Sequence, residues 1–597
     1  MDPFLRELCS NPDLKSRRSP AINRGYLARL LALEVSFERI LLLNQVQQVL
    51  SLGAGFDSMF FRLLNSEVIK RTELKYFEVD YPESVHRKYG RIKKSPILKS
   101  FFTECQQIQD CYVYDQGLFN MIGCNMTHID EFQTKLNQAG FDPNLPTVIL
   151  TECSTTYITA EDCISLISFL NKMIKKFVFI SYEQIRPLDD FGQIMTDHFE
   201  KRNSSLKCVK SYPTIEHHRQ RFLSFGWDKV EIQTIERIWK QFMNDSEMKR
   251  LNDIEDFDEV PELMLKCLHY VLIIGIKGLD LNLSPFWTIA EPDLKCEKMK
   301  MEMETIDNDR LKCYGHTSWT LKENSKLFVL GGVSASQARH QSICCLESDF
   351  KTVLWTKDFE PLMFSASAVQ NDVCFIFGGR NSPSDPKGEL FKINQDGDLE
   401  EIRLIGYKPK PRWGHSLTSI KEKLYLIGGR DNSETFNEVI EVDNDKCKVL
   451  AKLNHGLYSH STVSYGSKLV ISGGLKEFSK CEVSGNLIIF DTKTHTLEIF
   501  HVSKNVPRFA HTSHMTPDSK LLLVGGVNIY KQDIILTIID MTDLSIIQHF
   551  ESKSRLAAPL VQHCSRLEDK KIFIFGGGTN CFSFGMHVNP YLITIRL

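Results

Sequence analysis

One short pattern recurs six times in the second half of this chain. Each copy is an apolar, β-rich run that ends in two glycines, as in Lys326-Leu-Phe-Val-Leu-Gly-Gly. A strand and turn at a constant period builds one blade of a β-propeller, because a single unit of this size cannot bury its own apolar face. The repeats therefore predict an all-β, six-bladed propeller over residues 284–597. The glycine pairs begin at Gly331, Gly378, Gly428, Gly473, Gly525 and Gly576, about 50 residues apart.

Residues upstream of the glycine pairs indicate which kind of propeller these repeats form. A polar and aromatic motif precedes several pairs, as in Arg412-Trp-Gly-His-Ser, Tyr458-Ser-His-Ser and Arg508-Phe-Ala-His-Thr. Chance placement among the 33 glycines would not reproduce both the period and these flanks. The repeats resemble kelch repeats.

The last repeat is short of one strand. After Gly577 only one strand-like run remains, Tyr591–Leu597. An open propeller would leave unpaired strand edges, so the missing strand must come from elsewhere in the chain. We expect the segment Asp293–Glu304 to close the sixth blade.

The first half of the chain follows a different pattern, in which apolar strands alternate with helical stretches such as Ala160–Lys175. This alternation predicts an α/β, Rossmann-like domain over residues 1–283, with a mostly parallel, doubly wound sheet. A late run, Tyr270–Ile276, is expected to add a strand at the far side of the sheet. The other expected strands are Val46–Leu52, Leu74–Val79, Phe119–Gly123, Thr147–Thr151 and Phe177–Ser181.

A glycine turn and an acid in this half indicate a nucleoside cofactor. The first expected strand breaks into Leu52-Gly-Ala-Gly55, and the second ends on Asp80. Glycines let a ligand approach the backbone closely, and an acid at the tip of the next strand accepts hydrogen bonds from a ribose diol. Taken alone, the Gly-x-Gly turn also fits an ordinary strand-to-helix connection.

Five blocks of the first half, in this order, resemble the leucine carboxyl methyltransferases. This resemblance implies an S-adenosylmethionine-dependent O-methyltransferase that esterifies a carboxylate. The blocks are Pro20-Ala-Ile-Asn-Arg-Gly-Tyr-Leu-Ala-Arg29, Leu52-Gly-Ala-Gly-Phe-Asp57, Tyr76-Phe-Glu-Val-Asp-Tyr-Pro82, Pro146-Thr-Val-Ile-Leu-Thr-Glu152, and Ser181-Tyr-Glu-Gln184 followed by Phe191-Gly-Gln-Ile-Met195.

The same resemblance assigns cofactor contacts. Gly53 and Gly55 let the methionine part pass against the backbone, and Asp80 holds the ribose hydroxyls. Arg29 suits the cofactor carboxylate and Glu152 its ammonium, although surface ion pairs are the alternative for both. Where the family carries Asp-Leu at the adenine, this chain has Asn125-Met126; Asn125 still offers an amide oxygen to the adenine amino group.

Methyl transfer to a carboxylate needs no strong base, because a carboxylate is already ionised near neutral pH. Catalysis is then chiefly a matter of proximity and orientation. A cation that neutralises the incoming carboxylate is expected. Arg24 is the first candidate, with a structural role as the alternative, and Tyr157 and Tyr182 are possible partners.

The sequence leaves open which group accepts the methyl. Two carboxylates are candidates, and an inactive domain is a third possibility. Stand-alone members of the family methylate the C-terminal leucine of a type 2A protein phosphatase. The form fused to a kelch propeller completes wybutosine, the guanosine 3′ of the anticodon of phenylalanine tRNA: it esterifies the side-chain α-carboxylate and methoxycarbonylates the amino group, with carbon dioxide as co-substrate. The fusion favours the tRNA. A kelch protein-binding adaptor with an inactive methyltransferase domain is the third possibility.

Composition limits the partners further. The chain carries 72 Lys plus Arg against 75 Asp plus Glu, a net charge of −3, which excludes a globally basic nucleic-acid-binding protein. Two local basic runs, His86–Lys94 (continued by Lys99) and His217–Arg221, fit either RNA phosphates or solvated helix faces.

Cysteine usage and hydropathy indicate the compartment. The 17 cysteines form no C-x-x-C pair, so we expect no metal site. Free thiols and an N-terminus without a signal-peptide pattern predict a cytoplasmic protein. The longest apolar run, Tyr270–Ile276, is too short to cross a bilayer, so no membrane is expected.

Overall fold

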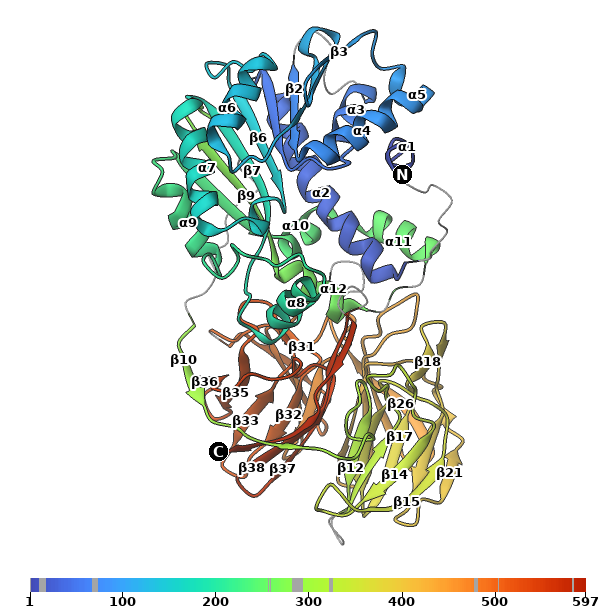
Figure 1. The fold of residues 1–597 in the computed structure, drawn as a ribbon. Helices are drawn as coiled ribbons and strands as arrows, with labels where there is room; N and C mark the ends of the chain where they lie inside the picture. The colour runs from blue at the N-terminus through green and yellow to red at the C-terminus, as the bar shows by residue number, and fades with distance from the viewer. Residues whose placement is uncertain are drawn as a thin grey trace.

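The computed structural model describes residues 2–9, 18–43, 45–66, 74–255, 257, 259–281, 294–321, 326–476, 481–502, 504–581 and 585–597. An N-terminal α/β domain is stacked on a β-propeller (Figure 1), which confirms the predicted fold class. The predicted boundary between residues 283 and 284 lies outside the described residues, as does Asp293.

A nine-stranded sheet forms the middle of the N-terminal domain. Its central strands β5, β2, β1, β6 and β7 are parallel, and the strands at both ends are antiparallel. In spatial order the strands are β3 (Cys105–Ile108), β4 (Cys111–Tyr114), β5 (Phe119–Gly123), β2 (Lys75–Asp80), β1 (Gln48–Leu52), β6 (Thr147–Glu152), β7 (Phe177–Gln184), β9 (Tyr270–Lys277) and β8 (Lys229–Thr234).

The strand predicted at Tyr270–Ile276 lies at the far side of the sheet as expected, but a further strand lies outside it. The run at Tyr270 does form β9, but β9 lies between β7 and β8 and is not at the edge. The edge strand β8 went unpredicted because Lys229, Glu231 and Gln233 interrupt its apolar residues. With a neighbour on each side, β9 is buried along almost its whole length, which explains its uninterrupted apolar sequence.

Helices cover both faces of the sheet. Val49 of β1 belongs to the apolar cluster on one face, and its neighbour Leu50 belongs to the cluster on the other, as alternating strand side chains require. Helices α2, α3 and α4 lie on the first face, and α6, α7 and α9 on the second (Figure 1). The helices are α1 (Leu5–Leu8), α2 (Pro20–Leu42), α3 (Met59–Asn65), α4 (Pro82–Lys94), α5 (Pro96–Lys99), α6 (Ile129–Gln138), α7 (Ala160–Met173), α8 (Asp190–Lys201), α9 (Ile215–Leu223), α10 (Ile235–Phe242), α11 (Asp245–Ile254) and α12 (Val260–Leu268), with the 3₁₀ turns η1 (Asp115–Gly117) and η2 (Thr155–Tyr157).

The propeller has six blades, and the first strand of each blade lies beside the first strand of the next along the chain. The blades are β12 (Thr317–Thr320), β13 (Leu327–Leu330), β14 (Ser342–Leu346) and β15 (Val353–Asp358); β16 (Ala366–Gln370), β17 (Val373–Phe377), β20 (Leu390–Ile393) and β21 (Leu399–Ile402); β23 (Ser416–Ile420), β24 (Lys423–Ile427), β25 (Glu438–Asp443) and β26 (Lys446–Lys452), with β22 (Ile405–Gly406) at its edge; β27 (Ser461–Tyr465), β28 (Lys468–Ser472), β29 (Leu487–Asp491) and β30 (Leu497–Phe500); β32 (Thr512–Met515), β33 (Lys520–Val524), β35 (Ile534–Asp540) and β36 (Ile546–Ser552); and β37 (His563–Glu568), β38 (Lys571–Gly576) and β41 (Tyr591–Arg596).

The segment expected to close the sixth blade divides between two blades. Strand β11 (Glu302–Thr305) pairs antiparallel with β41 and completes the sixth blade. The preceding strand β10 (Cys296–Met299) instead pairs parallel with β36 and adds a fifth strand to the fifth blade. The last two blades are therefore both tied to the chain that precedes the first blade, and β10 and β11 are their outermost strands.

The glycine pairs and the histidines of the upstream motifs meet at the junctions between blades. Gly576 has a φ of +63°, and a Cβ built on it would lie 2.3 Å from Cε1 of His316 in the first blade. The equivalent histidines of four other blades reach back in the same way to the glycine pair of the preceding blade: His415, His460, His511 and His563. In the second blade this position is Ser365. Only a residue without a side chain fits so close to the histidine ring.

The propeller packs against the N-terminal domain through the loops that follow the glycine pairs. Two short hairpins and one further two-stranded pairing lie there, and one apolar cluster runs without a break from α12 to propeller residues such as Phe509 and Val527. Polar contacts add to this interface: Nη2 of Arg186 donates to the Tyr530 carbonyl (3.0 Å), and Leu556 N donates to Asp190 (3.1 Å). The hairpins are β18 (Arg380–Ser382) with β19 (Asp385–Pro386) and β39 (Gly578–Cys581) with β40 (Gly585–Val588), and the other pairing is β31 (Arg508–Phe509) with β34 (Val527–Asn528).

Within the described ranges, none of the helices has the length and apolar character that a membrane span requires.

Candidate functional site

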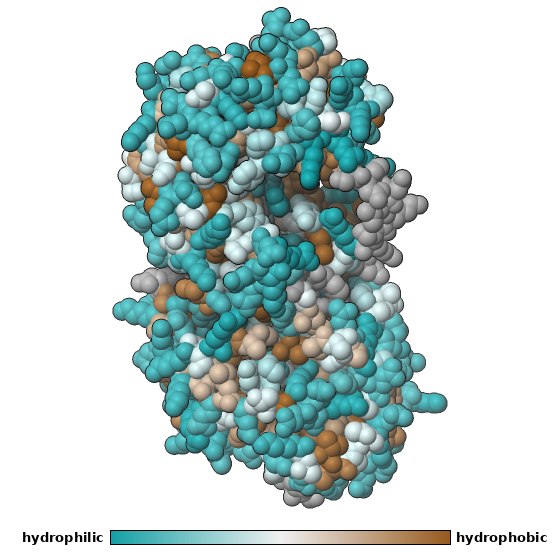
Figure 2. Space-filling view, in the orientation of Figure 1, coloured by the Kyte–Doolittle hydropathy of each residue, from teal (hydrophilic) through white to brown (hydrophobic). Residues whose placement is uncertain are grey.

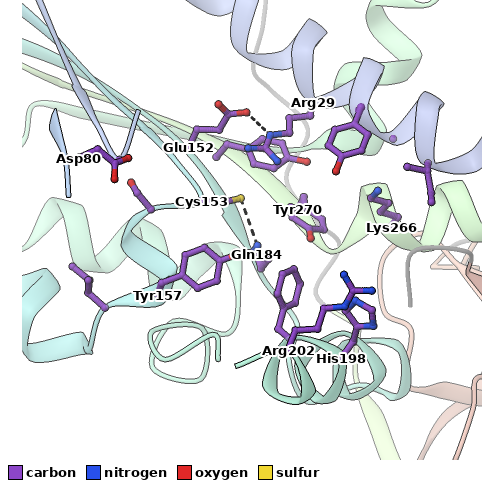
Figure 3. A pocket seen from close by; sticks show the side chains of 18 of the residues that line it. Arg29, Asp80, Glu152, Cys153, Tyr157, Gln184, His198, Arg202, Lys266 and Tyr270 are labelled. Atoms are coloured by element: carbon purple, nitrogen blue, oxygen red, sulfur yellow. Dashed lines mark hydrogen bonds and ion pairs between the residues drawn. The ribbon is translucent and has the colours of Figure 1, made fainter. Parts of the chain in front are cut away.

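A cavity of about 710 Å³ opens at the carboxyl ends of the parallel strands. This is where ligands bind in open α/β sheets. Figure 2 shows the surface hollowed in the middle of the N-terminal domain, and Figure 3 shows the side chains around the cavity. Its lining comes from α2, the ends of β1, β2, β6 and β7, and helices α8 and α12. The lining residues are Arg18, Ile22, Gly25, Tyr26, Arg29, Gly53, Asp80, Tyr81, Met126, Glu152, Cys153, Ser154, Tyr157, Ile158, Tyr182, Gln184, His198, Phe199, Arg202, Lys266 and Tyr270.

The glycine turn after β1 forms one wall of the cavity. Gly53 has a φ of +72°, and a Cβ on it would lie 2.4 Å from Cβ of Ser154, so a glycine is required there. Oγ of Ser154 is buried and has no hydrogen-bond partner among the described residues. Gly55 does not line the cavity, but its N–H donates to Asp80 over 2.7 Å. The turn therefore fixes the neighbouring carboxylate and leaves a polar atom for a ligand.

Asp80 stands at the end of β2, half-buried at the cavity wall. Its Oδ2 accepts from Gly55 N and its Oδ1 from Tyr81 N, both over 2.7 Å. A carboxylate oxygen can accept two hydrogen bonds, so each oxygen keeps capacity for one more. Two such acceptors side by side suit a vicinal diol such as that of a ribose.

Arg29 and Glu152 form an ion pair across the cavity (Figure 3). Arg29 comes from α2, and its Nε donates to the Glu152 carboxylate at the end of β6. Burial alone would lower the Arg29 pKa, but the neighbouring Cys153 and Glu152 raise it overall. In the part of the chain that is described, the outer guanidinium nitrogens of Arg29 have no acceptor. The pair thus offers free donors beside a free carboxylate oxygen, which is complementary to an amino acid zwitterion.

The structure does not place Asn125 at the cavity. Its amide oxygen accepts from the backbone N and Oγ1 of Thr127, over 3.1 and 3.0 Å. The side chain therefore caps its own turn after β5, as Asn often does. The adenine contact expected of Asn125 is not supported, whereas the adjacent Met126 does line the cavity.

Tyr157 and Tyr182 both line the cavity. Burial raises the pKa of Tyr157 to about 12 and lifts that of Tyr182 well above its ordinary value. Both phenols therefore stay protonated near neutral pH. They can donate hydrogen bonds to a substrate but cannot act as bases.

The structure does not place Arg24 at the cavity, so it does not support the expected substrate-binding role. Arg24 precedes Arg29 by five residues, which turns it roughly 140° away around α2. Its Nη2 donates to Asn252 Oδ1 of α11 (2.9 Å), and its guanidinium lies 4.3 Å from the centre of the Phe257 ring. It is 2% exposed and does not line the cavity. Arg24 is a structural residue between α2 and α11.

Several cavity residues were missed by sequence reasoning. Gln184 lies in the fifth of the family-like blocks, which was its only signal in the sequence. Its buried Oε1 has no partner among the described residues. Lys266 belongs to α12 and His198 to α8, and Arg202 is the residue that directly follows α8. Nothing in their local sequence marks them. They share a wall opposite Asp80 and Glu152 (Figure 3), so one side of the cavity is acidic and the other basic.

Over the described residues, no group of three or more His, Cys, Asp or Glu side chains is placed to hold a metal ion.

Comparisons with known proteins place both halves of the chain. A family model described as leucine carboxyl methyltransferase matches residues 4–171, and one described as the β-propeller of tRNA wybutosine-synthesizing protein 4 matches residues 360–591. The tRNA wybutosine-synthesizing protein 4 of Rattus norvegicus is 28% identical, covering 97% of this chain and 92% of its own length; that of Homo sapiens is 27% identical, covering 100% and 94%. Leucine carboxyl methyltransferase 1 of Bos taurus is 30% identical, covering 46% of this chain and 83% of its own length.

Proposed function

Since this chain belongs to the leucine carboxyl methyltransferase family, we propose that it completes wybutosine in phenylalanine tRNA with S-adenosylmethionine as methyl donor. The observation that carries the proposal is the propeller. Relatives named for wybutosine synthesis match the chain through both domains, whereas leucine carboxyl methyltransferase 1 matches only 46% of it. The acceptor we propose is the side-chain α-carboxylate of the modified guanosine 3′ of the anticodon.

The acidic wall of the cavity fits S-adenosylmethionine. Arg29 and Glu152 would hold the carboxylate and ammonium of its methionine part, and Asp80 the ribose hydroxyls. Met126 lies on the side where the adenine is expected. Ser154 Oγ, buried without a partner among the described atoms, is available to the ligand. When bound, the cofactor supplies a methyl group attached to a positively charged sulfur.

The residues around the acceptor position orient it and exclude water. An ionised carboxylate is already a nucleophile, and the protonated phenols of Tyr157 and Tyr182 are suited to hydrogen-bond it. The rate gain would come from alignment. For the second modification, the amino group of the side chain and carbon dioxide would combine to a carbamate with loss of one proton. This second carboxylate would then be esterified in the same cavity.

Helix α4 offers a surface for the tRNA backbone. It begins directly after Tyr81 at the cavity, and its exposed cations have no ion-pair partner among the described side chains. Beside them Tyr89 stacks on Tyr112, with ring centres 4.0 Å apart. Cations without local counter-charges suit phosphates, and affinity through them falls with salt. The exposed basic residues are His86, Arg87, Lys93, Lys94 and, on α5, Lys99.

The test is mass spectrometry of phenylalanine tRNA taken from cells that lack this gene. Incubation with the full chain and S-adenosylmethionine should add one methyl group to the carboxylate precursor. Adding isotope-labelled bicarbonate should place the label in a methoxycarbonyl group. Binding of the tRNA should weaken steeply as salt rises.

Two outcomes would contradict the proposal. Unchanged tRNA together with methylation of a phosphatase C-terminal leucine peptide would favour the stand-alone activity of the family. Absence of cofactor binding in calorimetry would favour the inactive adaptor.

A further inference from the structure

Lys266 is a cation at the cavity without a counter-charge in the described structure. It projects from α12 toward α2 on the basic wall (Figure 3), half-buried, and its ammonium has no acceptor or ion-pair partner within the described ranges. Arg29 differs, because Glu152 already neutralises it. A partly desolvated ammonium that faces a cavity is suited to bind an anion.

Helix α2 is shaped to receive this lysine. A Cβ on Gly25 would lie 2.7 Å from Nζ of Lys266 and 3.1 Å from its Cε, so the missing side chain forms a notch in which the lysine lies. The ring of Tyr26, the next residue, lies 5.5 Å from Nζ. The notch and the ring together hold the ammonium at one place on the cavity wall.

The propeller fixes the helix that carries Lys266. On one side α12 packs against α2, and on the other it packs against β39 and β34 of the propeller. Eight of the nine α12 residues are buried, and Lys266 is the exception. The lysine is therefore the one residue of α12 that keeps part of its surface open, and that surface lines the cavity.

We propose that the Lys266 ammonium binds the carboxylate of the acceptor and holds it for methylation. This inference rests on the proposed function. It assigns Lys266 the role first expected of Arg24, and it explains why a propeller is attached to a methyltransferase: strands β34 and β39 brace the helix that presents the substrate-binding cation. A neutral ester product would lose this charge pairing and leave.

The test compares tRNA carrying the free carboxylate with tRNA carrying the methyl ester. The full-length wild type should bind the acid form more tightly than the ester. Lys266→Met should reduce kcat/KM by roughly 10- to 100-fold and abolish the preference for the acid, while cofactor affinity stays unchanged. Lys266→Arg should restore part of the preference. If Lys266 were only structural, its replacement would weaken binding of both tRNA forms equally, and that result would overturn the proposal.

Gly25→Ala tests the same geometry without removing the charge. The new Cβ would displace the ammonium from its notch, and alanine favours the helix, so folding should be maintained. We expect the acid preference to fall as in Lys266→Met, with an unchanged or higher melting temperature. Full preference in both variants would overturn the proposal while leaving the methyltransferase function intact. A wild type that methylates no carboxylate of this tRNA would overturn the function itself.

Discussion

The two domains bury polar side chains for opposite purposes. In the propeller the buried histidines bind the neighbouring blade: Nε2 of His460 meets Ser416 Oγ (2.9 Å), and Nε2 of His511 meets Ser472 Oγ (3.0 Å). In the N-terminal domain, Ser154 Oγ and Gln184 Oε1 are buried at the cavity without partners among the described atoms. At these contacts the histidines of the repeat join neighbouring blades, whereas Ser154 Oγ and Gln184 Oε1 keep bonding capacity for a ligand.

Burial also keeps the propeller histidines uncharged. It lowers the pKa of His415 and of His460 to about 3, so these rings stay neutral across the physiological range. The junctions between blades are therefore insensitive to pH near neutrality, as a scaffold requires. The comparison predicts that substitutions at the cavity alter binding more than stability, and that substitutions at blade junctions do the reverse.

The largest effect is expected for Asp80→Ala. Loss of the carboxylate removes both acceptors proposed for the ribose, so cofactor affinity should fall by roughly 100-fold or more, with little change in melting temperature. Calorimetric titration with S-adenosylmethionine measures the cofactor affinity, and thermal unfolding measures the melting temperature. Asp80→Asn, which keeps one oxygen for the turn, should lose less affinity. If Asp80→Ala bound the cofactor as tightly as the wild type, the claim that cavity residues serve ligand binding would be contradicted.

Gly576→Ala probes a blade junction. A Cβ there would lie 2.3 Å from His316 and 2.5 Å from the Cys313 carbonyl, at the contact that joins the last blade to the first. We expect a loss of about 2–5 kcal/mol in the free energy of unfolding and, once the protein is folded, normal cofactor affinity.

Gly466→Ala is the matched control for this junction. Gly466 has nearly the same φ, +62°, but a Cβ on it meets nothing within 4 Å. Gly466→Ala should lower the free energy of unfolding only through the strain of an alanine at positive φ, about 1–2 kcal/mol. Equal losses in the two variants, measured by chemical denaturation, would show that the junction contact is unimportant.

The contrast between the domains also explains what the sequence could predict. The propeller repeats its signals, so period, strands and glycine pairs all indicated one architecture. In the N-terminal domain, Gly53 and Asp80 were recognisable because they follow strands in a known order. The division of the closing segment between two blades had no local signal, since β10 and β11 read as one polar stretch.

Residues on helices were the hardest to place. Arg24 and Arg29 lie in the same motif and differ only in the face of α2 that they occupy. Which face meets the cavity depends on how α10 and α12 pack against α2, and the motif does not contain that information. Lys266 is one lysine among many, and only the fold brings it to Gly25.

The interface between the domains should respond to pH, and Asp190→Asn tests this smallest effect. Burial raises the pKa of Asp190 to about 8, although the N–H of Leu556 that it accepts partly opposes the shift. In the unfolded chain this carboxyl ionises near its ordinary value of 3.8. The folded state therefore favours the protonated form, and the free energy of unfolding should fall as pH rises from about 4 to about 8.

An asparagine at position 190 stays uncharged and keeps an oxygen for Leu556. The variant and the wild type should melt alike near the acid end of this window, and the variant should melt a few degrees higher at its alkaline end. Thermal unfolding of both proteins across the window measures the difference. Parallel curves would mean that the Asp190 carboxyl does not couple the domain interface to pH. If the two melting-temperature curves converge toward acid pH, the interface contains a group that titrates near neutrality. The blade junctions, with their neutral histidines, do not depend on such a group.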